Sequence, residues 1–151
     1  MPLVIRRAGQ ADADLVVDFN RRLAEESEGK KLDTALLSAG VAQALADPQK
    51  GLYFLASDSE RVIGQMMITT EWSDWRNGWF WWIQSVYVRA EARRQGVFRS
   101  LFEHVHQAAR QDSSVIGLRL YVDRGNHAAQ ETYRHMGMTE TEYFVLEKYP
   151  L

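Results

Sequence analysis

The chain has 151 residues, of which 46% are hydrophobic and 25% charged, and its formal net charge is −2. This composition is typical of one globular domain over residues 1–151, and the charge argues against a nucleic-acid partner. The absence of cysteine excludes disulfides, thiolate zinc ligands and thiol nucleophiles. We see no signal peptide and no apolar run long enough to span a bilayer, so we expect a cytoplasmic protein with no membrane partner.

The first half of the chain predicts a strand, two helices and two further strands. Apolar residues recur at helical spacing in the two helices, and the later strands flank a polar turn. These elements are a strand over Leu3–Arg6, helices over Asp12–Glu26 and Asp33–Ala46, and strands over Leu52–Ser57 and Arg61–Glu71.

In the second half, Asn77-Gly78 is the strongest hairpin signal and leads into a further strand. The elements that follow are a strand over Trp79–Val88, an amphipathic helix over Gly96–Arg110 with Phe98, Leu101, Phe102, Val105 and Ala109 inward, a strand over Val115–Val122, a helix over His127–His135 and a final strand over Glu142–Tyr149. This order predicts an α+β fold, in which helices flank a mixed, mostly antiparallel, twisted sheet with one parallel crossover.

A basic turn joins the strand that ends at Val88 to the helix that begins at Gly96. It reads Arg93-Arg94-Gln95-Gly96-Val97-Phe98-Arg99. Backbone N–H groups at a helix start carry partial positive charge and suit a pyrophosphate. Gly96 lets the backbone approach such an anion closely, because glycine has no Cβ. We therefore expect a phosphate-bearing cofactor at this turn.

Two motifs resemble those of the GCN5-related N-acetyltransferases, the GNAT family. Ser85-Val86-Tyr87-Val88 followed by Arg93-x-x-Gly96 is similar to the family's acetyl-CoA motif. Its second motif is matched in order and spacing by Leu120-Tyr121-Val122, Asn126, Ala129, Tyr133 and Gly137-Met138. The resemblance covers essentially the whole chain. It implies the acyl-CoA N-acyltransferase fold, with direct transfer of an acetyl group from acetyl-CoA to a primary amine in a ternary complex.

The resemblance also implies how the co-substrate is held. The turn from Arg93 to Arg99 would bind the pyrophosphate through backbone amides, and Val86, Tyr87 and Val88 would pair with the pantetheine arm like an added strand. Phe98 stands where the family usually has Gly or Ala, so we expect its ring to point away from the pyrophosphate, into the core. An N–H near Val86 or Tyr87 would contact the thioester carbonyl.

The resemblance also implies roles for two residues of the second motif. Asn126 would hydrogen-bond the cofactor, cap the helix that starts at His127, or do both. Tyr133 would contact the cofactor and act in catalysis by stabilising the leaving thiolate. A phenol has a pKa of about 10 and a thiol of about 8.5, so a hydrogen bond describes this role better than full proton transfer. The alternative is a half-buried core tyrosine.

The resemblance implies that the acceptor is a primary amine of a small molecule or a peptide, and the sequence defines its pocket less well. Candidate contacts are Glu26, Trp72, Asp74, Trp75 and Gln84. A general base would help to deprotonate the amine, and Glu71, Asp74, Glu25 and Glu26 stay open as alternatives, each of which can also be a surface carboxylate. The hairpin Trp72-Ser73-Asp74-Trp75 resembles that of polyamine acetyltransferases. Those enzymes have acidic residues where Gln84 and Ser85 stand, which argues against a polyamine.

The same residues allow other functions and folds to be considered. A non-catalytic acyl-CoA-binding sensor or assembly module is the alternative to an enzyme, and a homodimer is possible through the aromatic hairpin or the C-terminal strand. A dinucleotide-binding domain fails because the turn has one glycine where that fingerprint needs three. A helix-turn-helix DNA binder fails on charge and strand content. Scattered histidines predict no metal site.

Overall fold

The computed structural model describes residues 2–151. The chain forms two compact units, Met1–Leu120 and Tyr121–Leu151. Within the described residues, no helix combines the length and the apolar character needed to cross a bilayer.

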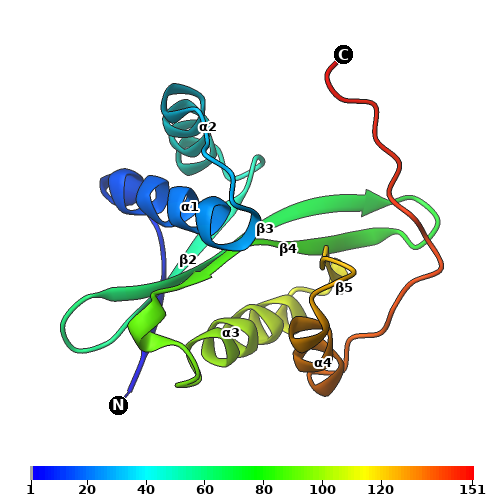
Figure 1. The fold of residues 1–151 in the computed structure, drawn as a ribbon. Coiled ribbons are helices and arrows are strands. Elements are labelled where there is room, and N and C mark those ends of the chain that lie inside the picture. Colours follow the sequence, from blue (N-terminus) through cyan, green and yellow to red (C-terminus); the bar gives the residue numbers. More distant parts are fainter. Residues whose placement is uncertain (1) are drawn as a thin grey trace. The chain divides into compact units, whose positions relative to one another are not determined.

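The first unit is a five-stranded sheet with helices on both faces (Figure 1). Its elements are β1 (Val4–Arg7), α1 (Ala13–Glu28), α2 (Thr34–Ala46), β2 (Leu52–Ser57), β3 (Val62–Ser73), β4 (Gly78–Val88), α3 (Val97–Gln111) and β5 (Val115–Leu120), with short 3-10 turns at Gln10–Asp12 and Ala90–Ala92. The strands lie in the order β1-β2-β3-β4-β5. All neighbours are antiparallel except β4 and β5, which are parallel. This confirms the predicted α+β class and the mixed, mostly antiparallel sheet.

The helices sandwich the sheet, with α1 and α2 over one face and α3 over the other (Figure 1). Large side chains that are almost wholly buried come from the sheet and from both helix layers: Val16, Phe19, Leu55, Met66, Ile68, Leu101 and Val105. Gly64 lets the start of α3 approach β3, because a Cβ at this position would lie 2.9 Å from the Val97 Cγ1 atom. The sheet and the first turn of α3 are therefore closely joined.

The hairpin predicted at Asn77-Gly78 is present and connects β3 to β4. Asn77 adopts the left-handed conformation with φ +50°, which asparagine tolerates better than most residues. Gly78 is buried, and a Cβ there would lie 2.4 Å from the Ile116 Cγ2 atom. Asn77 therefore suits the turn through its backbone conformation, and Gly78 suits it because there is no room for a side chain.

Two details of the prediction are corrected. The strand expected over Val115–Val122 ends at Leu120, where the first unit ends. The inward face of α3 also differs by one residue at its start. Val97 is buried, whereas Phe98 is only half-buried and its ring lies 6.1 Å from that of Phe102. Gly64 makes room for Val97 under the helix, so Val97 takes the inward position at the start of α3.

The second unit contains α4 (His127–His135). The Asn126 side chain accepts a hydrogen bond from the Ala129 N–H at 3.1 Å, so it caps this helix as predicted. Gly137 lies just beyond the end of the helix with φ +89°, a left-handed conformation that glycine adopts without strain.

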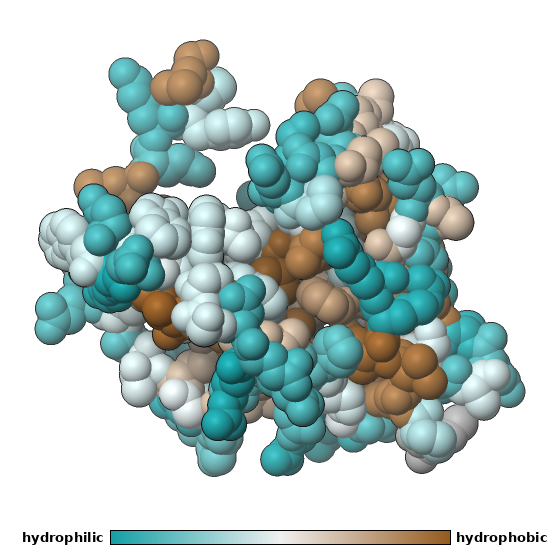
Figure 2. All heavy atoms as spheres, turned by 180° about the vertical axis from the view of Figure 1, so that it is seen from behind, coloured by the Kyte–Doolittle hydropathy of each residue, from teal (hydrophilic) through white to brown (hydrophobic). Residues whose placement is uncertain are grey.

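The final strand predicted over Glu142–Tyr149 is wrong: residues 142–149 have no regular secondary structure. The four consecutive apolar residues in this segment, Tyr143, Phe144, Val145 and Leu146, are 66%, 77%, 70% and 93% exposed. Strand composition alone does not make a strand, because the backbone N–H and C=O groups need a neighbouring strand to pair with. Figure 2 shows that apolar side chains reach the surface at several places on the face it displays.

Candidate functional site

The second half of β4 has an open edge. β5 pairs with β4 only from Trp79 to Ile83, so its hydrogen bonds stop before Gln84. β3 continues along the other side as far as Val88. Within residues 2–151, no strand pairs with the opposite edge of β4 between Gln84 and Val88. An extended molecule could therefore add to the sheet there by bonding to backbone groups.

A β-bulge lies in this open half. Gln65 pairs with Tyr87 and Met67 pairs with Gln84, so two residues of β4, Ser85 and Val86, stand opposite one residue of β3. Ser85 has a φ of +50°, a left-handed conformation that is strained for serine. A bulge re-aims the backbone of its strand, and this one changes the direction of the peptide groups at the open edge.

The basic turn has the backbone conformation expected of an anion site. Arg94 and Gly96 have φ values of +63° and +83°, so the chain curls tightly before α3. The first hydrogen bond of α3 runs from the Ser100 N–H to the Gly96 carbonyl at 3.0 Å. The amides of Val97 and Arg99 precede that bond, at the positive end of the helix dipole. This turn can therefore receive a phosphate through its backbone.

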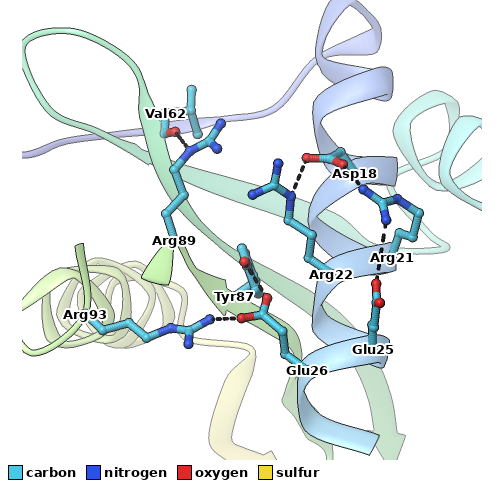
Figure 3. Close-up of polar contacts among 9 residues, drawn as sticks. All are labelled: Asp18, Arg21, Arg22, Glu25, Glu26, Val62, Tyr87, Arg89 and Arg93. Carbon is cyan, nitrogen blue, oxygen red and sulfur yellow. Dashed lines mark hydrogen bonds and ion pairs between the residues drawn. The ribbon is translucent and has the colours of Figure 1, made fainter. Parts of the chain in front are cut away.

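The Arg93 side chain is bonded within the protein. Its NH2 group donates to Glu26 Oε1 at 2.8 Å (Figure 3). Its Nε donates to the Val88 carbonyl at 2.9 Å. The guanidinium also lies over the Tyr87 ring, 5.5 Å from its centroid. Arg93 therefore fastens the turn to the end of β4 and to α1. Arg94 and Gln95 are exposed, and Arg99 pairs with Glu103 at 3.0 Å.

Glu26 lies at the centre of this contact network. Its other oxygen, Oε2, accepts a hydrogen bond of 2.6 Å from the Tyr87 hydroxyl. These bonds, first from Tyr87 and then from Arg93, hold the pKa of Glu26 below its ordinary value. Burial and the nearby Glu26 charge raise the pKa of the Tyr87 phenol. The carboxylate predicted to contact the acceptor is thus ionised and engaged on both oxygens, which suits positioning better than proton abstraction.

The other candidate bases lie in different surroundings. Glu71 Oε1 accepts from Arg119 NH1 at 3.0 Å and from Trp82 Nε1 at 3.2 Å. Glu25 lies 3.7 Å from Arg21. Within residues 2–151, Asp74 accepts only a local bond, from the Trp75 N–H to its Oδ1 atom at 2.9 Å.

The predicted acceptor residues do not form one cluster. Trp72 and Trp79 pack edge to face with ring centroids 5.0 Å apart at the hairpin end of β4, and Trp75 beside them is 85% exposed. Glu26 instead contacts Tyr87, eight residues further along β4, which is roughly 25 Å away in an extended strand. Gln84 lies between, and its Nε2 donates to Thr69 Oγ1 at 2.6 Å.

A buried amide on β3 was missed in the sequence. Gln65 is fully buried, and its Nε2 donates to the Ser85 carbonyl at 3.0 Å, directly at the bulge. The available signal was one polar residue inside the apolar run Val62-Ile63-Gly64-Gln65-Met66-Met67-Ile68. Such an interruption predicts a buried polar contact but does not identify its partner.

The remaining predicted site residues, Asn126 and Tyr133, belong to the second unit. Asn126 is the N-cap of α4, and Tyr133 lies about two turns further along the same helix. The Tyr133 side chain is half-buried, and burial raises the pKa of its phenol. A raised pKa keeps the phenol protonated at neutral pH, as a hydrogen-bond donor must be.

Comparison with known proteins agrees with this geometry. A model of the Acetyltransferase (GNAT) family matches residues 16–138. A possible acetyltransferase from Clostridium difficile 630 has 42% sequence identity and a TM-score of 0.93, covering 100% of this chain and 99% of that one. No curated protein sequence matches the chain.

Two more distant structures share the fold. A predicted acetyltransferase with acetyl-CoA from Clostridium acetobutylicum is 16% identical, with a TM-score of 0.80, over 97% of this chain and 96% of that one. An aminoglycoside acetyltransferase from an uncultured soil metagenomic sample, in complex with sisomicin, is 17% identical, with a TM-score of 0.76, over 99% and 96%. The family match over most of the chain confirms the resemblance of the two motifs, and the chain belongs to the Acetyltransferase (GNAT) family.

Proposed function

We propose that this protein is an acetyl-CoA-dependent N-acetyltransferase that acts on a primary amine of a small molecule or a peptide. The observation that carries the proposal is the open edge of β4 from Gln84 to Val88, in the same compact unit as the left-handed turn that begins α3. Family membership supports acetyl transfer, and one structure of the same fold is named as a complex with acetyl-CoA.

The first unit would hold the co-substrate mainly through backbone groups. Amides of residues 94–99 would bind the pyrophosphate, and the turn's left-handed Gly96 is suited to that contact. Val86, Tyr87 and Val88 would bond to the pantetheine arm along the open edge. Arg93 would support this site from behind, since its own side chain is bonded to Glu26.

The second unit would contribute Asn126 and Tyr133, in roles that follow from the family motif. We infer that the two units act as one domain, because the family match runs across their boundary. Asn126 would contact the co-substrate through groups that its capping bond leaves available. Tyr133 would donate a hydrogen bond to the thiolate that leaves as the amine attacks the thioester carbonyl.

In the proposed reaction, the amine nitrogen forms a bond to the carbonyl carbon and the carbon–sulfur bond breaks. An alkylammonium of pKa about 10 must first lose a proton, at a cost of roughly 4 kcal/mol near neutral pH. Asp74 has a local backbone bond only, whereas Glu26 and Glu71 are bonded to arginines. Asp74 lies at the hairpin end of β4, roughly 25 Å or more from Tyr87, so we assign it, with Trp72 and Trp75, to contacts with the far end of the acceptor, and the proton would leave through water.

Release of CoA thiol from acetyl-CoA, measured across a panel of amines, tests this function. The panel contains aminoglycosides, amino acids, polyamines, and peptides with free lysines or N-termini, and the chain has no cysteine to add background. We expect release with at least one monoamine or aminoglycoside and none above background with polyamines. Calorimetric binding of acetyl-CoA is measured alongside. Binding without release over the whole panel would favour the alternative, a non-catalytic acyl-CoA sensor or assembly module.

We also propose that the protein forms a homodimer through its C-terminal segment. Residues 143–146 are consecutive apolar residues with strand composition, and all four are mostly exposed in the single chain. A second copy of the chain would bury them and provide hydrogen-bond partners for their backbone. The exposed Trp75 at the hairpin tip is the other surface that the sequence suggests for a dimer.

A further inference from the structure

Gln65 is a polar side chain at a place where the sheet is otherwise apolar. It is 0% exposed, and its strand neighbour Met66 is also fully buried. A buried amide needs hydrogen-bond partners to offset the loss of water. Its Nε2 has two of them, the Ser85 carbonyl at 3.0 Å and Asn20 Oδ1 at 3.2 Å. Gln65 therefore links α1, β3 and β4 through one amide group.

The bond to Ser85 falls on the bulge of β4. Ser85 has the left-handed φ of +50°, and Ser85 and Val86 together stand opposite Met66. In a regular ladder the Ser85 carbonyl would accept a hydrogen bond from a neighbouring strand. Here it accepts one from the buried Gln65 side chain. This interaction fixes the direction of the peptide groups that follow, at Val86 and Tyr87.

The remaining oxygen of the amide, Gln65 Oε1, has no hydrogen-bond partner within residues 2–151, although it is buried. An unsatisfied buried acceptor is unfavourable, and an apolar residue of similar length would avoid it. The acceptor of this amide therefore does not explain a glutamine here. The donor does, because only a donor at this position can bond to the Ser85 carbonyl and to Asn20 Oδ1.

We propose that Gln65 is a positioning residue for acyl transfer: it holds the Ser85 carbonyl inward, so that the backbone of Val86 and Tyr87 meets the acyl-CoA arm in the correct geometry. This inference rests on the proposed function, since it concerns the same open edge of β4. Gln65 acts through the backbone and does not itself contact the co-substrate.

Two substitutions test the role of the donor. Gln65→Met keeps the length of the side chain and removes the donor, so we expect acetyl-CoA affinity to fall by up to about tenfold, the equivalent of one hydrogen bond. Gln65→Glu provides a donor that depends on pH. Burial raises the pKa of a carboxyl, and the protonated form can still donate to the Ser85 carbonyl, whereas the ionised form offers only acceptors.

The affinity of Gln65→Glu for acetyl-CoA, measured by calorimetry from pH 5.5 to 9, should therefore fall as pH rises, relative to the wild type at each pH. Among residues 2–151, the titratable groups that face the amide or Tyr87 keep their charge over this range. Tyr53 accepts a hydrogen bond from Asn20, and Tyr87 is the residue of β4 that pairs with Gln65. Burial raises the pKa of both phenols. Glu26, Arg22 and Arg93 interact with Tyr87 and stay charged, because the pKa of Glu26 is lowered and the pKa values of both arginines are raised.

Asn20→Leu is the matched control, because it removes the other partner of the amide and leaves the Ser85 bond in place. We expect it to lower the melting temperature while its acetyl-CoA affinity follows the wild type across pH. Two results would overturn the proposal: a folded Gln65→Met with wild-type affinity and kcat/KM, or a Gln65→Glu whose affinity shows no pH dependence beyond that of the wild type.

A ligand-free readout separates this proposal from the proposed function. In Gln65→Glu, the backbone amide NMR shifts of Val86 and Tyr87 should titrate with the introduced carboxyl, whereas those of Asn20→Leu should not. If the wild type binds no acetyl-CoA, the proposed function fails, and the amide shifts still decide whether Gln65 sets the bulge. Shifts that do not titrate while the introduced carboxyl itself does would overturn the positioning role.

Discussion

Glu26 is bonded on both carboxylate oxygens, to Tyr87 and Arg93, and this has a consequence for stability. Because its pKa is lowered in the folded protein, Glu26 adds stability that is fully present above its unfolded pKa of about 4.3. That contribution is lost as pH falls through the lower, folded pKa. Urea unfolding of the wild type and Glu26→Gln should therefore differ most near pH 6, and the difference should shrink toward pH 3.

Glu25→Gln is the control for this measurement, since Glu25 is exposed and lies 3.7 Å from Arg21 instead. Its effect on the free energy of unfolding should be small at every pH. A Glu26→Gln effect that stays constant from pH 6 to pH 3 would contradict the role of these bonds.

Tyr133 is the residue that we place at the leaving thiolate. Tyr133→Phe removes the hydroxyl and keeps the ring, so turnover should fall by about 100-fold, the effect of losing one transition-state hydrogen-bond donor. Calorimetric affinity for acetyl-CoA should stay within about twofold, because the thioester is held elsewhere. Tyr121→Phe serves as the control, because Tyr121 is an exposed tyrosine of the same unit. Wild-type turnover in Tyr133→Phe would remove this residue from the mechanism.

At the scale of elements, the turn before α3 depends on the conformation of Gly96. Its φ of +83° is strained for any residue with a Cβ, although a Cβ there would meet no atom within 4 Å. Gly96→Ala should therefore lower the free energy of unfolding by about 1–2 kcal/mol and weaken acetyl-CoA binding. Gly40 lies within α2, also with no atom within 4 Å of a Cβ. Gly40→Ala should instead stabilise the protein by about 1 kcal/mol and leave binding unchanged.

Chemical denaturation gives the change in the free energy of unfolding for both variants, so Gly40→Ala shows what the same substitution does at a glycine without a left-handed conformation. If Gly96→Ala were as stable as the wild type and bound acetyl-CoA equally well, the turn would not need its left-handed residue. If Gly40→Ala were equally harmful, the loss at Gly96 would reflect substitution in general.

Most elements could be predicted because their signals are local. Periodicity located α1, α2 and α3, and Asn77-Gly78 located the hairpin. The network around Glu26 could not be predicted, since Tyr87 and Arg93 lie 61 and 67 residues away in the sequence. The Gln65 contact with Asn20 spans 45 residues. Such contacts are set by how the helices pack on the sheet, and a local pattern contains no information about that packing.

The bulge in β4 shows the same limit within one element. The apolar run from Trp79 to Val88 predicts a strand, and a strand is present. The residue that departs from it, Ser85, is an ordinary serine that gives no turn signal. Its carbonyl bonds to Gln65 on the partner strand, 20 residues away in the sequence, so the local pattern that predicts the strand cannot predict the bulge within it.

At the scale of the whole molecule, the exposed run Tyr143-Phe144-Val145-Leu146 predicts how the chain associates. Side chains 66–93% exposed over four consecutive residues are unfavourable in water, and burying them would be strongly favourable. Sedimentation equilibrium should therefore show a dimer for the wild type. Phe144→Asp with Leu146→Asp should give a monomer, because two charges would be desolvated at the interface.

Two controls separate this segment from other surfaces and from unfolding. Thr139→Asp adds a charge just before the run and should leave the dimer intact, and Trp75→Ala tests the hairpin tip in the same way. Circular dichroism and acetyl-CoA binding of the double variant establish that the first unit is still folded. A wild type that stays monomeric at all concentrations would reject the dimer, while a dimer broken only by Trp75→Ala would move the interface to the hairpin. Loss of the dimer in the C-terminal variant alone would mean that these residues, although they form no strand in the single chain, acquire their partner in a second copy.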